Sequence, residues 1–297
     1  MKFCASLLAV LAACASGRYQ SAADDIDDPV DAAPAVDTGT TDAPAVPIDG
    51  PGPDAPPAAV APLLLSELSL APNSSEMIEV YNPTSAPVAL RNFYLTDVPT
   101  YFRLPAAGQS ADTSDFIVRF PAGAMIPAHG VVTIALDTAV NFTTATGTAP
   151  TYSVAGATME LVAGSAPTLT NTGEPVVLFY WDGVSDRITD VDVMLAGAPT
   201  ASNALLDKSS VTVDGPDADA LATAYAADAM TITAQTAAPG SSLSTKRVAL
   251  ESAGTEHQTG GNGVLGQDET SEQTQTTWDS GTFSALTPGS VPAALMN

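Results

Sequence analysis

The chain has 297 residues, of which 33 are acidic and nine are basic, so its formal charge is −24. A surface this acidic repels phosphate backbones, which excludes nucleic acid as a partner. Charged residues make up only 14% of the chain and apolar residues 45%, and the remainder is rich in Thr, Ser, Gly and Pro. This composition favours short strands and turns over long helices, and we expect an all-β fold in one domain.

The first residues have the layout of an export signal. Lys2 precedes the apolar run Leu7–Leu11, which is too short to span a membrane. The sequence Leu11-Ala12-Ala13-Cys14 resembles a bacterial lipobox, where a signal peptidase cuts before a cysteine that becomes lipidated. An ordinary signal cleaved after Ala15 is the alternative, because Ala13-Cys14-Ala15 also fits a small-x-small cleavage site.

We therefore expect residues 1–13 to be a lipoprotein signal peptide and Cys14 to bear the lipid. Cys4 would leave with the signal, and the sequence has no third cysteine for a disulfide or a metal site. The expected partner is a membrane, reached through the lipid anchor. The expected location is the bacterial outer membrane or cell surface, with secretion as the alternative.

Residues 14–61 are dominated by Asp, Ala and Pro, and no basic residue lies between Arg18 and Arg91. Aspartates repel one another and prolines favour extended backbone, so this segment cannot bury a core. We predict a disordered tether that holds the folded part away from the membrane.

Apolar and alternating runs after the tether predict short strands separated by turns. The run Val176–Trp181 is the most apolar and predicts a central strand, and Asp182-Gly183 predicts a tight hairpin after it. A short helix is expected within Ala220–Ala229. The expected strands are Leu63–Leu70, Met77–Tyr81, Val88–Asp97, Asp115–Phe120, Val131–Leu136, Val176–Trp181, Ile188–Met194 and Leu243–Val248.

Short motifs in and between these segments occur in the order seen in one known domain family. They are Glu67 within SELSL, Ile78–Pro83, Tyr94–Asp97, Pro121–Gly130, Asn171–Gly183, Leu243–Val248, Thr277-Trp278-Asp279 and Thr287-Pro288-Gly289. They resemble the lamin tail domain, an immunoglobulin-like β-sandwich found in nuclear lamins and in many bacterial surface proteins. His129 departs from the pattern, since the family usually has a small residue there.

The resemblance implies that residues 62–292 form an immunoglobulin-like β-sandwich of the lamin tail type with loop insertions, and that residues 293–297 are a short tail. It also implies a non-enzymatic role. The expected function is a lipid-anchored cell-surface binding or structural module with an unidentified surface or extracellular partner. The alternative is a secreted accessory module of a separate exported hydrolase or nuclease, because bacterial lamin tail domains are often joined to such enzymes.

The sequence lacks the residue patterns of common catalytic sites. His129 and His257 lie in glycine-containing loops without metal-binding spacing, and no serine has the G-x-S-x-G frame of a nucleophile elbow. We expect no enzymatic activity and no resident cofactor.

Two acidic loops are nevertheless candidates for a calcium site. Oxygen ligands on a flexible loop suit Ca²⁺, although neither loop has the spacing of a dedicated calcium loop. The alternative is a pair of hydrophilic turns in which Asp and Gly serve turn geometry. The candidate ligands are Asp214, Asp217 and Asp219 in one loop and Asp268, Glu269 and Glu272 in the other.

Overall fold

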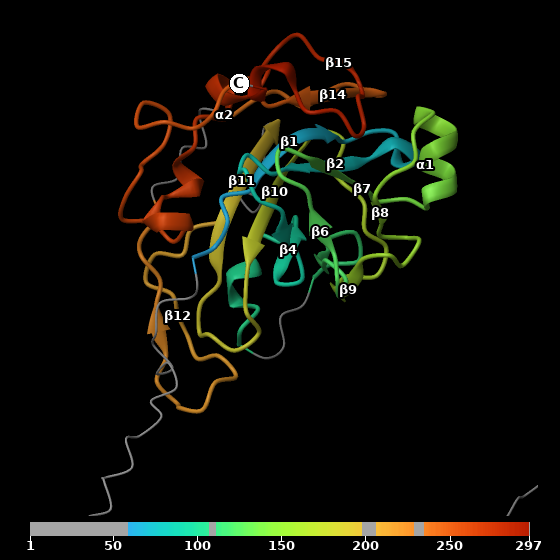
Figure 1. The fold of residues 1–297 in the computed structure, drawn as a ribbon. Coiled ribbons are helices and arrows are strands. Elements are labelled where there is room, and N and C mark those ends of the chain that lie inside the picture. Colours follow the sequence, from blue (N-terminus) through green and yellow to red (C-terminus); the bar gives the residue numbers. More distant parts are fainter. Residues whose placement is uncertain (1–58, 107–110, 198–205, 229–234, 297) are drawn as a thin grey trace, which may run out of the picture. The chain divides into compact units, whose positions relative to one another are not determined.

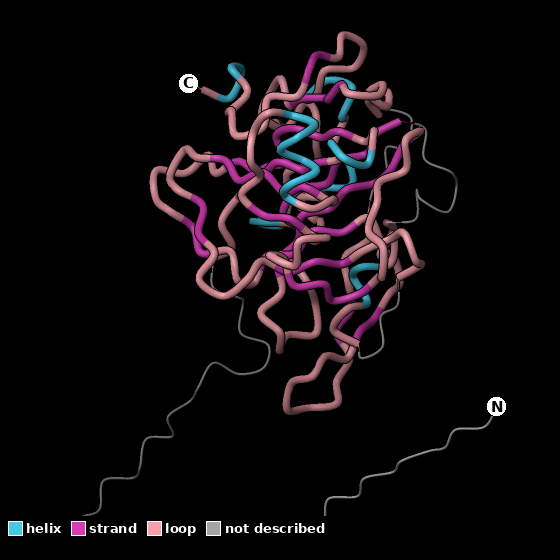
Figure 2. Tube along the Cα trace, turned by 90° about the vertical axis from the view of Figure 1, so that its right-hand side faces the viewer, coloured by secondary structure: helices cyan, strands magenta, loops and turns pink. Residues whose placement is uncertain are grey.

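The computed structural model describes residues 59–106, 111–197, 206–228 and 235–296. The expected signal peptide, Cys14 and all but the last three residues of the expected tether lie outside the described residues. Strands in several sheets make up most of the regular structure, and the helices are few and short, which confirms the all-β prediction (Figures 1 and 2). Within the described ranges no helix is long and apolar enough to cross a membrane.

The first sheet has six strands in the order β15-β14-β1-β2-β7-β8. Neighbouring strands are antiparallel except β7 and β8, which are parallel. The strands are β15 (Ser284–Ala285), β14 (Leu243–Lys246), β1 (Leu64–Ser69), β2 (Met77–Tyr81), β7 (Val131–Ala135) and β8 (Tyr152–Ser153).

The second sheet has five antiparallel strands in the order β11-β10-β4-β5-β9. The expected central strand is confirmed, because β10 pairs with β11 on one side and β4 on the other. The strands are β11 (Thr189–Gly197), β10 (Gly173–Tyr180), β4 (Phe93–Thr96), β5 (Ile117–Arg119) and β9 (Glu160–Ala163).

Two small sheets and several helical turns complete the regular structure of the described residues. The small sheets pair β3 (Val88–Ala89) with β6 (Met125–Ile126) and β12 (Thr212–Val213) with β13 (Thr223–Ala224). The α-helices are α1 (Ala139–Thr146) and α2 (Thr274–Thr277). The 3₁₀ helices are η1 (Asn73–Ser75), η2 (Tyr101–Arg103), η3 (Val264–Gly266), η4 (Glu269–Ser271) and η5 (Ala293–Leu295).

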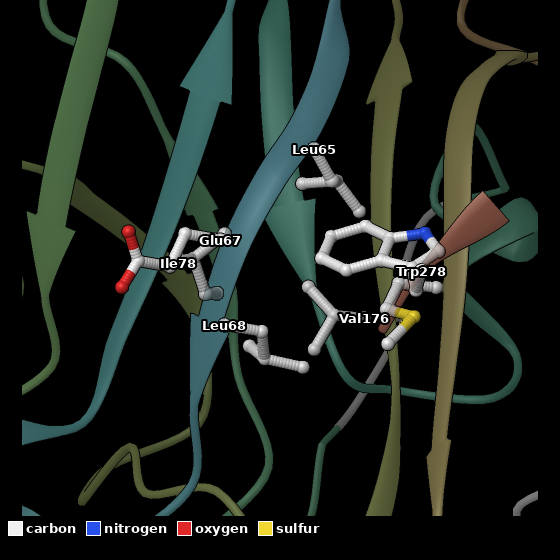
Figure 3. A pocket seen from close by; sticks show the side chains of 7 residues that line it. Leu65, Glu67, Leu68, Ile78, Val176 and Trp278 are labelled. Carbon is white, nitrogen blue, oxygen red and sulfur yellow. The ribbon is translucent and has the colours of Figure 1, made fainter. Parts of the chain in front are cut away.

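Side chains of both large sheets join one buried cluster. Leu65 and Leu68 of β1 enter this core, as do Val176 and Leu178 of β10. A bulge between Leu65 and Glu67 explains why two leucines three positions apart share a face, since an extra residue shifts the alternation by one. Figure 3 shows Leu65, Leu68 and Val176 gathered near the Trp278 ring, while the carboxylate of Glu67 points away from it. The gap among these side chains has no room for a water molecule.

The second sheet is also covered on its other face. Val177 and Phe179 of β10 point into a second buried cluster, where Phe179 stacks on Tyr94 with ring centroids 5.0 Å apart. Tyr225, next to β13, also packs there. The strand β10 is therefore buried on both faces, as its near-continuous apolar sequence requires.

Two local predictions are wrong. The described part of Ala220–Ala229 forms β13 and loop instead of a helix, because its backbone pairs with β12 and Tyr225 is drawn into the second cluster. The connection from β10 to β11 is longer than a tight hairpin, since Tyr180 pairs with Thr189. The Asp182 carboxylate shapes this loop by accepting hydrogen bonds from the backbone of Val184 and Ser185.

Candidate functional site

Arg247, directly after β14, is fully buried and bonds to four parts of the chain. Its Nη2 lies 2.6 Å from Asp192 Oδ2 in β11, and its Nη1 lies 2.9 Å from Glu272 Oε1 and 2.8 Å from Glu251 Oε1. Its Nε donates to the Leu65 carbonyl, and its guanidinium lies 5.0 Å from the centre of the Trp278 ring. Arg247 thereby connects the end of β14, in the first sheet, to β11 of the second sheet and to the segment after β14 that contains Glu251 and Glu272.

The same contacts satisfy the backbone at the β1 bulge. The Leu65 amide donates to Asp192 Oδ2 at 2.6 Å, the Leu65 carbonyl accepts from Arg247 Nε, and the Ser66 carbonyl accepts from the Arg247 amide. A bulge leaves ladder groups unpaired, and a buried unpaired group is costly. The Asp192–Arg247 ion pair therefore has a structural role.

Two further carboxylates, Glu256 and Glu269, gather with Glu251 beside Arg247. Glu251, Glu256 and Glu269, here called the carboxylate trio, each offer an oxygen that lies within 4.8 Å of the other two. Glu256 is 3% exposed and Glu269 is 2% exposed. Burial raises the pKa of Glu256 to about 8 and the pKa of Glu269 well above its usual range, and the nearby Glu251 adds to both shifts.

Backbone pairing between two loop segments assembles the trio. The Asp268 amide donates to the His257 carbonyl, and the Gln273 amide donates to the Thr255 carbonyl. The His257 amide also donates to Ser271 Oγ at 2.8 Å. These bonds fix the segment that contains Glu256 against the segment that contains Glu269.

Gly263, in the glycine-rich loop before Asp268 and Glu269, lies close against the Glu269 side chain. A Cβ at this position would lie 2.7 Å from Glu269 Oε1 and 2.8 Å from the Gln267 carbonyl oxygen. Any other residue would clash with the Glu269 side chain in its present position. The glycine thus gives this carboxylate its place beside the loop.

The structure separates the candidate ligands of the second acidic loop. Glu269 belongs to the carboxylate trio, and Glu272 groups with Asp192 and Glu251 around Arg247. Asp268 belongs to neither group, because its carboxylate accepts from Thr270 Oγ1 and lies 3.9 Å from His257 Nδ1. The sequence did not single out Glu251 or Glu256. The one feature that could have indicated a buried charged cluster is Asp192, an acidic residue within an apolar strand segment.

The first acidic loop is arranged differently. Asp214 and Asp217 group with Asp186, which the sequence did not single out, and Asp219 lies outside the group. Both Asp186 oxygens are satisfied, one by the Gly215 amide at 2.7 Å and the other by Thr223 Oγ1 at 2.6 Å. Asp214 is exposed and Asp217 is half-buried. Asp186 thus ties the Gly215 turn to β13 through these two hydrogen bonds.

A buried lysine forms the other charged cluster. Lys208 Nζ lies 2.8 Å from Asp190 Oδ2 and 3.4 Å from Asp228 Oδ2, and Tyr101 donates its hydroxyl to Asp190 at 2.6 Å. Burial opposes the charge on Lys208, but the two aspartates outweigh this effect and raise its pKa. The lysine is therefore a charged, partnered crosslink between β11 and the loop that contains Asp228.

Comparisons of the chain with protein-family models, curated proteins and solved structures found no match.

Proposed function

We propose that this chain is a lipid-anchored, non-enzymatic module of the bacterial outer membrane or cell surface, which binds or supports another surface component. The observation on which the proposal rests is the Leu11-Ala12-Ala13-Cys14 lipobox followed by an Asp- and Pro-rich segment. That order provides an anchor, a spacer and then a folded body. The strongly acidic composition of the chain favours a basic or cation-bearing partner over an anionic one.

We further propose that the body is an immunoglobulin-like β-sandwich of the lamin tail type. The two large sheets consist mainly of antiparallel strands and share one buried cluster, which is compatible with this architecture. In Figure 1, β1 and β2 lie between β15 on one side and β4 and β10 on the other.

Contacts between distant motif residues support the same proposal. Glu67 accepts hydrogen bonds from both the amide and the hydroxyl of Thr287, at 2.8 and 2.6 Å. Asn82 donates to the Pro127 carbonyl at 2.9 Å, and Asp97 accepts from the Phe116 amide at 2.7 Å. Residues that underlie the resemblance are thus buried polar groups that fasten turns to strands, a role that needs their particular side chains.

Membrane attachment through Cys14 tests the proposed function. The full-length chain, expressed in a bacterium that processes lipoproteins, should incorporate labelled palmitate and remain in the membrane fraction at high salt. Cys14→Ala should lose both properties, because a lipid chain supplies the binding energy for such anchoring. Cys4→Ala, whose cysteine lies within the expected signal peptide, is the control and should keep both. Membrane retention of Cys14→Ala at high salt would contradict the proposal.

A further inference from the structure

We propose that Glu251, Glu256 and Glu269 form a binding site for one Ca²⁺ ion. The proposal concerns the folded body alone and is independent of the proposed lipid anchor. It rests on three observations: the convergence of the three carboxylates, the absence of hydrogen-bond partners for two of their buried oxygens, and the pairing of Arg247 with Glu251 but not with Glu256 or Glu269.

The spacing of the carboxylate trio suits calcium. Ca²⁺ binds oxygens at about 2.3–2.6 Å, so two ligand oxygens on opposite sides of the ion are about 4.6–5.2 Å apart. The three oxygens of the trio lie within 4.8 Å of one another, so one ion can contact all of them without movement of the backbone. Ca²⁺ also tolerates irregular geometry and accepts water at its remaining positions.

Two oxygens of the trio are buried without a partner. Oε2 of Glu269 and Oε1 of Glu256 make no hydrogen bond with any of the described residues. The other oxygen of Glu256 accepts from Gln258 Nε2 at 2.7 Å, which orients that carboxylate. A carboxylate removed from water requires hydrogen bonds or a nearby cation, and here Glu256 and Glu269 each offer an oxygen within 4.8 Å of another carboxylate.

Arg247 forms an ion pair with only one member of the trio, Glu251. Its Nη2 is bonded to Asp192, its Nε to the Leu65 carbonyl, and its Nη1 is shared between Glu272 and Glu251. Among the described residues no basic side chain lies within ion-pair distance of Glu256 or Glu269. A divalent cation at the trio would therefore neutralise the carboxylates that Arg247 leaves uncompensated.

The donor set favours calcium over other metals. Three carboxylates offer only hard oxygen ligands, whereas zinc sites in proteins use mainly nitrogen and sulfur. Mg²⁺ requires near-ideal octahedral geometry at about 2.0–2.1 Å and retains its water, which makes a compact all-protein site unfavourable. The Asp186, Asp214 and Asp217 group does not qualify, since the buried member already has a donor on each oxygen.

Calcium titration of the purified full-length chain in detergent tests the proposal. Metal is first removed with EDTA, and Ca²⁺ is then added at constant ionic strength. The heat of binding is measured by calorimetry, and the thermal midpoint of unfolding is measured at each Ca²⁺ concentration. We expect one saturable site per chain and a rise in the midpoint that follows its occupancy, because an ion that binds only the folded state stabilises it. Mg²⁺ at the same concentration should produce a much smaller rise.

Isosteric variants locate the ion. Glu269→Gln and Glu256→Gln should each weaken Ca²⁺ binding by about tenfold or more, since each removes a charged ligand. Without calcium their thermal midpoints should equal or exceed that of the parent, because each substitution replaces a buried carboxyl group, whose ionisation burial disfavours, with a neutral amide. Glu160→Gln is the control: it makes the same chemical change at a side chain that is 47% exposed and outside the trio, and it should leave calcium affinity unchanged.

Three outcomes would overturn the proposal. One is a non-saturating rise of equal size with Ca²⁺ and Mg²⁺, which is the behaviour of a generally acidic surface. The second is an unchanged calcium affinity in both glutamine variants. Native mass spectrometry of the parent gives a third test that needs no variant, because a folded chain that binds no Ca²⁺ excludes the site.

Discussion

Glu67 and Glu79 lie directly opposite each other on β1 and β2, and both are fully buried. Like charges at opposed positions destabilise a sheet unless other groups offset them. Two of the offsetting groups belong to the C-terminal turn: Glu67 accepts from the Thr287 amide, and Glu79 accepts from the Gly289 amide at 2.7 Å. The pair therefore fastens the end of the folded body to the first sheet.

This pair makes stability depend on pH. Burial raises the pKa of Glu79 to about 7, against the hydrogen bonds of Gly289 and Thr133 that lower it, and Glu67 adds to the rise. Because the pKa is higher in the folded state than in the unfolded state, the contribution of Glu79 is fully present below about pH 4.5 and is lost as the pH rises through 7. Urea denaturation should show the free energy of unfolding falling across this interval.

The substitution Glu79→Gln should reduce that fall and raise stability at pH 8 by on the order of 1–3 kcal/mol. Its amide oxygen can still accept from Gly289, while its nitrogen can face Ser66, whose Oγ lies 3.3 Å from Glu79 Oε1. Glu160→Gln is the control, since that side chain is 47% exposed and pairs with Arg91 at the surface. Equal pH profiles for Glu79→Gln and the parent would rule out a titrating buried Glu79.

Removal of Arg247 should strongly destabilise the fold. Arg247→Met keeps the apolar stem but leaves Asp192 and Glu272 buried without their cation, which should cost about 3–5 kcal/mol. Arg103→Met, at an exposed position, should change the free energy of unfolding by less than about 1 kcal/mol. Chemical denaturation of both variants measures the difference, and comparable values would contradict a central role for Arg247.

The core between the sheets gives a second stability prediction. Leu178 is completely buried in β10, so Leu178→Ala should cost about 2–5 kcal/mol through lost burial and the cavity left behind. Leu221→Ala makes the same chemical change at a side chain that is 75% exposed and should cost little. The two thermal midpoints should differ by several degrees.

Gly263→Ala tests the close approach of the glycine-rich loop. The new methyl group would meet Glu269 Oε1 at 2.7 Å and the Gln267 carbonyl oxygen at 2.8 Å, and the backbone contact cannot be relieved by a rotamer change. We expect destabilisation of about 1–3 kcal/mol and weaker Ca²⁺ binding. Gly281→Ala, whose Cβ would meet no atom within 4 Å, should alter neither the thermal midpoint nor the calcium titration.

Much of the strand content follows from local pattern. Met77–Tyr81 and Val131–Ala135 become β2 and β7, because alternation places one set of side chains in the core. Val176 to Tyr180 lacks this alternation and lies in a strand covered on both faces. Local pattern failed at Ala220–Ala229, where helix-favouring alanines were overridden by β-pairing and the burial of Tyr225.

The sequence by itself determined the all-β class and the positions of the central strands, because hydrophobic alternation depends only on neighbouring residues. The tertiary structure alone decided strand order and the position of Arg247 between Asp192 and Glu272, which lie 55 and 25 residues away from it. It also decided that Glu251 and Glu256 meet Glu269 while Asp268 does not. Convergence of carboxylates depends on the paths of the loops, and those paths follow from long-range backbone pairing that leaves no periodic signal in the sequence.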